Sequence, residues 1–178
     1  IGTETEGLYY LDVNTNRIRQ NHIAENSLSK KINYITGTGD TLWIATQNGV
    51  YVSTSDGKII KHFSTNEGLS HNNIRQVFID IDNVVWVATK SNGLCMIENA
   101  EEISYKFSDG LQEIEFTSIT QDQSGNYWAA TSGTGVLCFM PDTLINISID
   151  DGLKSSYCYS IICDNFGSIW IGHRLGLS

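Results

Sequence analysis

Short runs of apolar, β-branched and aromatic residues recur along the chain of 178 residues, separated by polar turns that contain glycine. Such runs between turn signals predict short antiparallel β-strands. First strands are predicted at 32–36, 74–80, 116–122 and 158–164, and second strands, each with a tryptophan, at 42–46, 84–89, 127–131 and 169–172. Third strands are predicted at 49–53, 93–98 and 135–140, and fourth strands at 17–23, 58–63, 103–107 and 144–149.

The strand pattern repeats with a fixed period. The four tryptophans, Trp43, Trp86, Trp128 and Trp170, stand 43, 42 and 42 residues apart. The strongest copy of the repeat covers 66–94, with further copies at 108–136 and 150–177 and a weaker one at 25–50. Self-similarity at this period indicates a repeat architecture, and four short strands per repeat are typical of a β-propeller blade. We therefore predict an all-β fold, a β-propeller portion of about four blades with four antiparallel strands each.

The repeat also sets the predicted organisation of the chain. Its units are placed at 1–43, 44–86, 87–128 and 129–170, and 171–178 would begin a further strand. Because Ile1-Gly2-Thr3 aligns with residues 44–46, and the chain stops just past Trp170, both ends fall within a repeat. We expect an excerpt of a longer protein, cut from a larger ring. Exposed blade faces would then bind the remaining blades or a second copy, as a homodimer.

Composition excludes several functions. Apolar residues make up 40% of the chain, enough for a packed core, and the net charge of −9 argues against a nucleic-acid partner. No apolar run is long enough to span a bilayer, so this segment is predicted to make no membrane contact. The four cysteines show no metal-binding spacing and fall out of register with one another, which predicts buried free thiols, no metal and no cofactor.

Two sets of repeated residues receive structural interpretations. Asp80, Asp122 and Asp164 each precede a repeat tryptophan by six residues, and their carboxylates are expected to accept amide hydrogens of the turn. Asn83, Gly125, Gly167 and Asp40 are expected to take positive φ in these turns, and the first turn, where Gly37 replaces the aspartate, should be looser. The tryptophans are assigned to packing between blades. A ring of acids for catalysis or calcium, and a tryptophan platform for a sugar, are the alternatives.

Unit 68–94 has Gly-Leu-Ser at 68–70, an apolar strand ending at Asp80, an apolar strand with Trp86 that ends at Thr89, and Gly-Leu at 93–94. In these features it resembles the two-component regulator propeller repeat. The resemblance implies one blade per repeat of a seven-bladed ring in the periplasmic sensor region of a hybrid two-component system histidine kinase. It further implies recognition of an oligosaccharide and a signal passed to the kinase, with no chemistry in this segment. Ser27, Gly37 and His173 depart from the pattern.

The loops that precede the first strands are the expected ligand surface, because loops at one end of a propeller line its mouth. The candidate ligand-binding residues are His71, Asn72, Asn73, Glu113, Glu115, Tyr157, His173 and Arg174. Amide and carboxylate groups can bind sugar hydroxyls, and Tyr157 could stack on a pyranose. Solvated loops without a ligand are the alternative for each residue taken singly.

Two other functions stay open at this point. Glu113 and Glu115 could form an acid pair of a glycosidase, but the turns lack the full Asp-box pattern of sialidases and the arginines occupy unrelated repeat positions. A scaffold for protein partners is the other alternative. A transmembrane helix and kinase downstream in the gene would favour the sensor.

Overall fold

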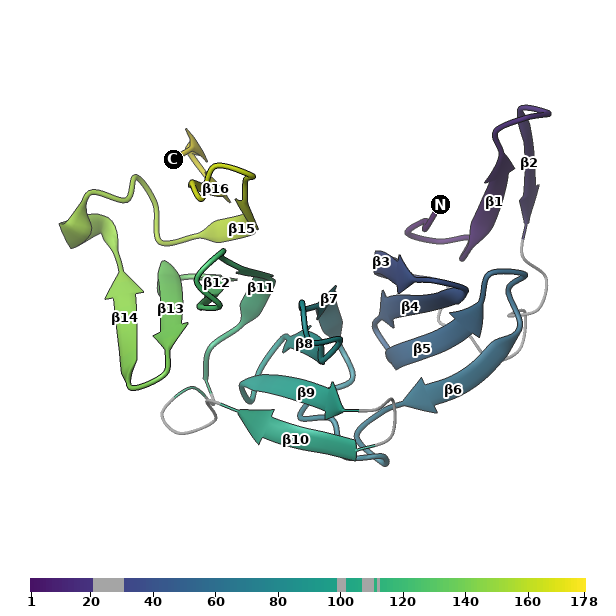
Figure 1. The fold of residues 1–178 in the computed structure, drawn as a ribbon, viewed down its shortest axis with the longest axis horizontal. Coiled ribbons are helices and arrows are strands. Elements are labelled where there is room, and N and C mark those ends of the chain that lie inside the picture. The colour runs from purple at the N-terminus through teal and green to yellow at the C-terminus, as the bar shows by residue number, and fades with distance from the viewer. Residues whose placement is uncertain (21–30, 99–101, 107–110, 112) are drawn as a thin grey trace.

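The structure, a computed structural model, describes residues 1–20, 31–98, 102–106, 111 and 113–178. Its described strands form separate antiparallel sheets that follow one another along an open arc (Figure 1). Three of the sheets have four strands each. They are β3 (Ile32–Thr38), β4 (Thr41–Thr46), β5 (Gly49–Thr54) and β6 (Ile59–Phe63); β7 (Ile74–Ile79), β8 (Val85–Thr89), β9 (Leu94–Glu98) and β10 (Glu102–Lys106); and β11 (Phe116–Gln121), β12 (Tyr127–Thr131), β13 (Val136–Met140) and β14 (Thr143–Ile147). The predicted four-stranded units are confirmed in these three sheets.

The described residues at either end of the arc form smaller sheets. A hairpin of β1 (Tyr9–Asp12) and β2 (Arg17–Gln20) lies near the N-terminus, and the predicted strand at 17–23 is seen as far as Gln20, its last three residues lying outside the described part. The other end has a sheet of β15 (Cys158–Cys163), β16 (Ile169–His173) and β17 (Gly176–Leu177), after a short 3-10 helix at Ile149–Asp151. Both sheets are antiparallel, as predicted.

Strands β3, β7, β11 and β15 occupy the inner side of the arc, and β6, β10 and β14 its outer side (Figure 1). Each inner strand contacts the inner strand of the next sheet. This radial order is that of propeller blades, in which the first strand of each repeat lies nearest the axis.

The core lies between neighbouring sheets. One cluster joins Trp43 and Val52 of one sheet to Val77 and Val87 of the next, and another joins Trp86 to Phe116. A third joins β13 to β15 and β16, with Trp128 packed against it. A blade covers its apolar faces only by stacking on its neighbours, so the prediction that the tryptophans pack between blades is confirmed for these three. Trp86 is 1% exposed, whereas Trp170, at the same repeat position, is 43% exposed.

The turns ahead of three tryptophans follow the prediction. Asn83, Gly125 and Gly167 have φ of 62°, 85° and 84°. The Oδ1 atom of each preceding aspartate accepts two amide hydrogens of its turn at 2.9 to 3.0 Å, in the turns of Asp80, Asp122 and Asp164. One carboxylate oxygen thereby satisfies two turn amides that no strand partner reaches.

The first of these turns differs from the prediction. Positive φ falls on Gly39 (56°) and not on Asp40, and Thr38 pairs with Thr41. The connection is therefore a two-residue hairpin loop, tighter than the aspartate turns. The expectation of a looser turn was wrong, because Gly37 continues β3. The longer pairing between strands fixes this turn in place of the missing carboxylate.

The thiols of Cys95, Cys138, Cys158 and Cys163 are free, and the first three are buried as predicted. Cys163 is only half-buried, so the prediction of a buried thiol was wrong there. Among the described residues, no helix combines the length and apolar character needed to span a membrane.

Candidate functional site

Each inner strand contains a β-bulge at the same point. The pairing with the second strand shifts between Ile32 and Tyr34, and again one repeat later between Ile74 and Gln76. The same shift recurs in β11 and β15. The residues skipped by the pairing are Asn33, Arg75, Thr117 and Tyr159. A bulge re-aims the side chain of the extra residue, so one side chain per blade leaves the regular alternation of the sheet.

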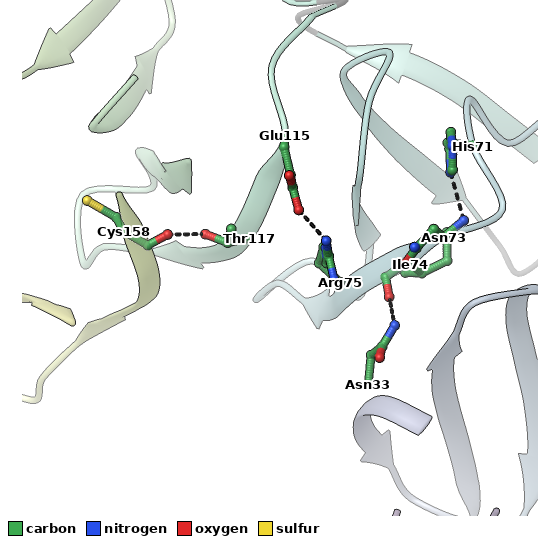
Figure 2. Close-up of polar contacts among 8 residues, drawn as sticks. All are labelled: Asn33, His71, Asn73, Ile74, Arg75, Glu115, Thr117 and Cys158. Atoms are coloured by element: carbon green, nitrogen blue, oxygen red, sulfur yellow. Dashed lines mark hydrogen bonds and ion pairs between the residues drawn. The ribbon is translucent and has the colours of Figure 1, made fainter. Parts of the chain in front are cut away.

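Three of the bulge residues reach toward the next sheet (Figure 2). Asn33 Nδ2 donates to the carbonyl oxygen of Ile74 at 2.6 Å, and Thr117 Oγ1 donates to that of Cys158 at 2.8 Å. Arg75 Nη2 forms an ion pair with Glu115, just before β11. The bulges therefore connect consecutive blades along the inner side of the arc.

A second set of contacts reinforces this connection. Ile119 N donates to Gln76 Oε1 at 2.5 Å, and Ile161 N donates to Ser118 Oγ at 3.2 Å. Gln76 and Ser118 are the residues that follow the bulges. The inner strands belong to separate sheets and do not pair with one another, so these side chains satisfy backbone groups that strand pairing between the sheets does not reach.

The bulges border a cavity of about 510 Å³. Its lining residues come from β3, β7, β11, β15 and the ends of two loops, and they are Asn33, Arg75, Glu115, Thr117, Ser132 and Tyr159. All of them carry a polar atom, and Tyr159 adds an aromatic ring. We refer to this space as the bulge cavity.

The charges of the bulge cavity are balanced. The guanidinium of Arg75 and the carboxylate of Glu115 are both half-buried and pair with each other. Arg75 Nε is buried with no hydrogen-bond partner among the described residues. A guanidinium has five N–H donors, so its pairing with one carboxylate leaves it incompletely satisfied.

The residues at 71–73, predicted to bind a ligand, form hydrogen bonds that fix the conformation of their own loop. Asn73 N donates to His71 Nδ1 at 2.8 Å, and Asn72 Oδ1 accepts from Thr65 N at 2.8 Å. The carbonyl of Asn72 also accepts from Gly49 N at 2.7 Å, which ties the loop to β5. None of the three residues lines the bulge cavity.

The other predicted ligand residues are spread over different surroundings. Glu113 is exposed in a turn, and only Glu115 lines the bulge cavity. Tyr157, on the loop before β15, is half-exposed, and its carbonyl accepts a hydrogen bond from Arg174 N at 3.0 Å. His173 is buried, and its Nε2 lies 2.9 Å from Ser178 Oγ. The structure therefore does not bring these residues together into one site.

His173 replaces a threonine that ends the second strand in the other copies. Thr46, Thr89 and Thr131 each donate from Oγ1 to a glycine carbonyl of the next turn at 2.8 to 2.9 Å. His173 Nδ1 accepts from Leu175 N at 3.2 Å, as Thr46 Oγ1 accepts from Asn48 N at 2.9 Å. The imidazole thus keeps the hydrogen bond to the turn amide.

The acid ring considered for the turn aspartates has another explanation. The second carboxylate oxygen of each accepts the indole N–H of its repeat tryptophan at 2.8 Å, in the pairs Asp80–Trp86, Asp122–Trp128 and Asp164–Trp170. Burial alone would raise the pKa of Asp122, but hydrogen bonds from Trp128 and Asn126 hold it below its usual value. Among the described residues, no group of three or more His, Cys, Asp or Glu side chains could hold a metal ion.

Sequence reasoning missed five of the six residues that line the bulge cavity: Ser132, and the four bulge residues of the inner strands, Asn33, Arg75, Thr117 and Tyr159. The four bulge residues stand 42 residues apart, each just after the buried first residue of a first strand. Their common register is visible in the repeat, but a polar residue at that position of a strand does not by itself mark a binding residue. The bulge that turns them toward the cavity left no separate signal.

The fold and its repeat define the class of this chain, a β-propeller segment of four-stranded blades. Residues 68–91 match the family model for the two component regulator propeller, and that unit is such a repeat. A search of the curated proteins found no match.

Solved structures share the fold. The extracellular domain described as that of the hybrid two component system BT3049 from B. thetaiotaomicron has 22% identity and a TM-score of 0.79, over 99% of this chain and 24% of that one. The extracellular domain described as that of the hybrid two component system BT4673 from the same organism has 22% identity and a TM-score of 0.81, over 99% of this chain and 25% of that one. Virginiamycin B lyase from Staphylococcus aureus has 15% identity and a TM-score of 0.64, over 83% and 54%. The chain spans about a quarter of the length of the first two structures.

Proposed function

We propose that this chain is part of the extracytoplasmic, periplasmic sensor region of a hybrid two-component signalling protein anchored in the inner membrane. In this role it senses an oligosaccharide and passes the signal to a histidine kinase. The observation that carries the proposal is the two component regulator propeller repeat at 68–91. The shared fold of extracellular domains described as parts of such systems supports it.

The structure supports binding over chemistry in this segment. The acid pair considered for glycoside hydrolysis needs two free carboxyl groups facing one sugar. Glu115 is instead paired with Arg75, and Glu113 is exposed in its turn. We therefore propose that the chain is non-catalytic, although the solved lyase shares its fold.

The proposal includes a partner for the exposed face of the β15–β17 sheet. Trp170 and Ile162 lie on this face, and the equivalent Trp86 and Trp128 pack against a following sheet. Further blades or a second copy of the chain would cover this apolar surface in the same way.

A glycan array tests the sensing role. The purified protein, labelled on lysine and applied to neutral and acidic glycans, is expected to bind one related set of oligosaccharides saturably. Free oligosaccharide of the same kind should compete. Uniform absence of binding across the array would contradict oligosaccharide sensing and favour the alternative role of a scaffold for protein partners.

A further inference from the structure

We infer that the bulge cavity is a subsite for an uncharged sugar ring, so that the ligand is a neutral oligosaccharide and not an acidic one. This inference rests on the proposed sensing function and specifies both the place and the chemical class of the ligand. It also moves the binding site from the loops before the first strands to the bulges of the inner strands.

The size and lining of the cavity suit one or two sugar rings. Ligand pockets commonly measure about 300 to 1,000 Å³, and this one measures about 510 Å³. Its six polar side chains come from four consecutive sheets. Four of them converge because each inner strand has its bulge at the same register, and Glu115 and Ser132 join them from loops. Hydroxyl-rich ligands need such a convergent set of donors and acceptors.

The charge balance of the cavity selects a neutral ligand. Among the described residues of the lining, Arg75 is the only cationic one, and it already pairs with Glu115. A carboxylated or sulfated sugar would bring a second negative charge beside the half-buried Glu115 carboxylate at a single guanidinium, and this like-charge repulsion disfavours it. A neutral hydroxyl can instead use the remaining N–H donors of the guanidinium while the ion pair stays intact. The net charge of −9 further disfavours an acidic polymer.

Tyr159 supplies the apolar surface that a pyranose needs. Tyr159 lies at the same bulge register as Asn33 and Thr117, and it is the aromatic residue among the described residues that line the cavity. An aromatic ring with one wet edge can cover the C–H face of a sugar while its hydroxyl stays hydrated. Tyr159 is therefore the expected stacking residue.

Isothermal titration calorimetry on the whole chain tests this inference. The probes are neutral hexasaccharides of xylose, mannose, glucose and galactose, and an acidic hexagalacturonate. The wild-type protein is expected to bind at least one neutral hexasaccharide, with an affinity that changes little between low and high salt. Tyr159→Ala should weaken that binding at least tenfold, as loss of a stacking contact does.

Tyr157→Ala is the matched control. Tyr157 is 48% exposed, lies two residues from Tyr159 and does not line the cavity. Its substitution should change the affinity less than twofold. Glu115→Gln should weaken the neutral hexasaccharide and strengthen hexagalacturonate, because Arg75 is then free to pair with a sugar carboxylate. Thermal unfolding followed by circular dichroism checks that each variant is folded.

Each contrary outcome points to a different failure. Binding of hexagalacturonate alone, falling steeply with salt, would overturn the neutral class and leave oligosaccharide sensing intact. Sensitivity to Tyr157→Ala but not to Tyr159→Ala would place the site on the loops and overturn the bulge cavity. A folded wild-type protein that binds none of the hexasaccharides would overturn both this inference and the proposed function.

Discussion

The indole Nε1 of Trp86 donates a hydrogen bond of 2.8 Å to Asp80 Oδ2, across a turn of the same hairpin. The other oxygen of that carboxylate accepts the amide hydrogens of Asp82 and Val84. One aspartate thus joins the turn to the tryptophan that packs between blades. The same hydrogen bonds recur in the next two repeats, and in the first of these Trp128 also packs against the following sheet.

Asp80→Ala is expected to lower the free energy of unfolding by about 3 kcal/mol, because it leaves buried donors without an acceptor. Besides Trp86 Nε1, the hydroxyl of Tyr127 in the neighbouring sheet donates to Asp80 Oδ2 at 2.8 Å. Urea denaturation followed by tryptophan fluorescence measures the change. Asp82→Ala, at an exposed position of the same turn, should stay within about 0.5 kcal/mol of wild type. Equal losses in the two variants would contradict the account.

Acid should destabilise the fold through the turn aspartates. Hydrogen bonds from Trp170 and the Ser168 amide lower the pKa of Asp164, and those from Trp128 and Asn126 lower that of Asp122 against the effect of burial. Because the pKa of each aspartate is lower in the folded state, the unfolded chain binds more protons. The stabilisation from these carboxylates is therefore fully present above the unfolded-state pKa of about 3.9, and it is lost as the pH falls through the folded-state pKa.

Urea unfolding at pH 7, 5, 4 and 3 checks this dependence. Wild type should change little between pH 7 and 5 and lose stability below about pH 4. Asp122→Asn should start less stable at pH 7 and show a shallower fall, because it no longer titrates there. A fall as steep as that of wild type would show that other groups cause the acid sensitivity.

Gly49→Ala is expected to destabilise the fold by more than about 2 kcal/mol, because a Cβ there would meet the carbonyl oxygen of Phe63 and φ is +97°. Gly39→Ala is the matched control. Its φ is +56°, but nothing lies within 4 Å of the added atom. The only expected loss is therefore the cost of a left-handed conformation for alanine, about 1 kcal/mol of the free energy of unfolding. Thermal unfolding of both variants should separate them, and equal midpoints would contradict the steric argument.

The 178-residue chain is expected to self-associate through the face that carries Trp170 and Ile162. Ile162→Lys should shift it toward monomer, because a lysine cannot be buried there without a partner. Ile60→Lys is the control, since Ile60 is 54% exposed on the outer strand β6 and Ile162 is 59% exposed on this face. Size exclusion with light scattering gives the mass. A monomeric wild type would contradict the proposed pairing.

Local features of each blade were predictable from the repeat. The strand order, the antiparallel hairpins and the aspartate turns follow from short-range pairing and turn chemistry within about 42 residues. The one wrong turn, at Gly39, concerns the copy without the aspartate, where longer strand pairing replaced a side-chain contact. The hydrogen bonds from Trp86, Trp128 and Trp170 to the aspartate six residues earlier were not predicted, since the spacing alone did not show that the indole N–H points toward the turn.

The candidate site was predicted less well. The loops before the first strands were predicted to be the ligand surface because loops at one end of a propeller line its mouth, yet of the residues predicted there only Glu115 lines the bulge cavity. Arg75 was treated as an arginine at an unrelated repeat position. Its bulge, and the ion pair to a residue 40 positions later, appear only once two blades are packed together.

The sequence by itself determined the blade, because every blade repeats the same local contacts within one period. Only the tertiary structure decided which side chains of different blades meet. Asn33, Arg75, Thr117 and Tyr159 lie 42 residues apart. They come together because packing of tryptophans and apolar strands between the sheets sets the curvature of the arc, and the bulges then turn these side chains inward. That curvature is a sum of contacts between repeats, which no single repeat contains.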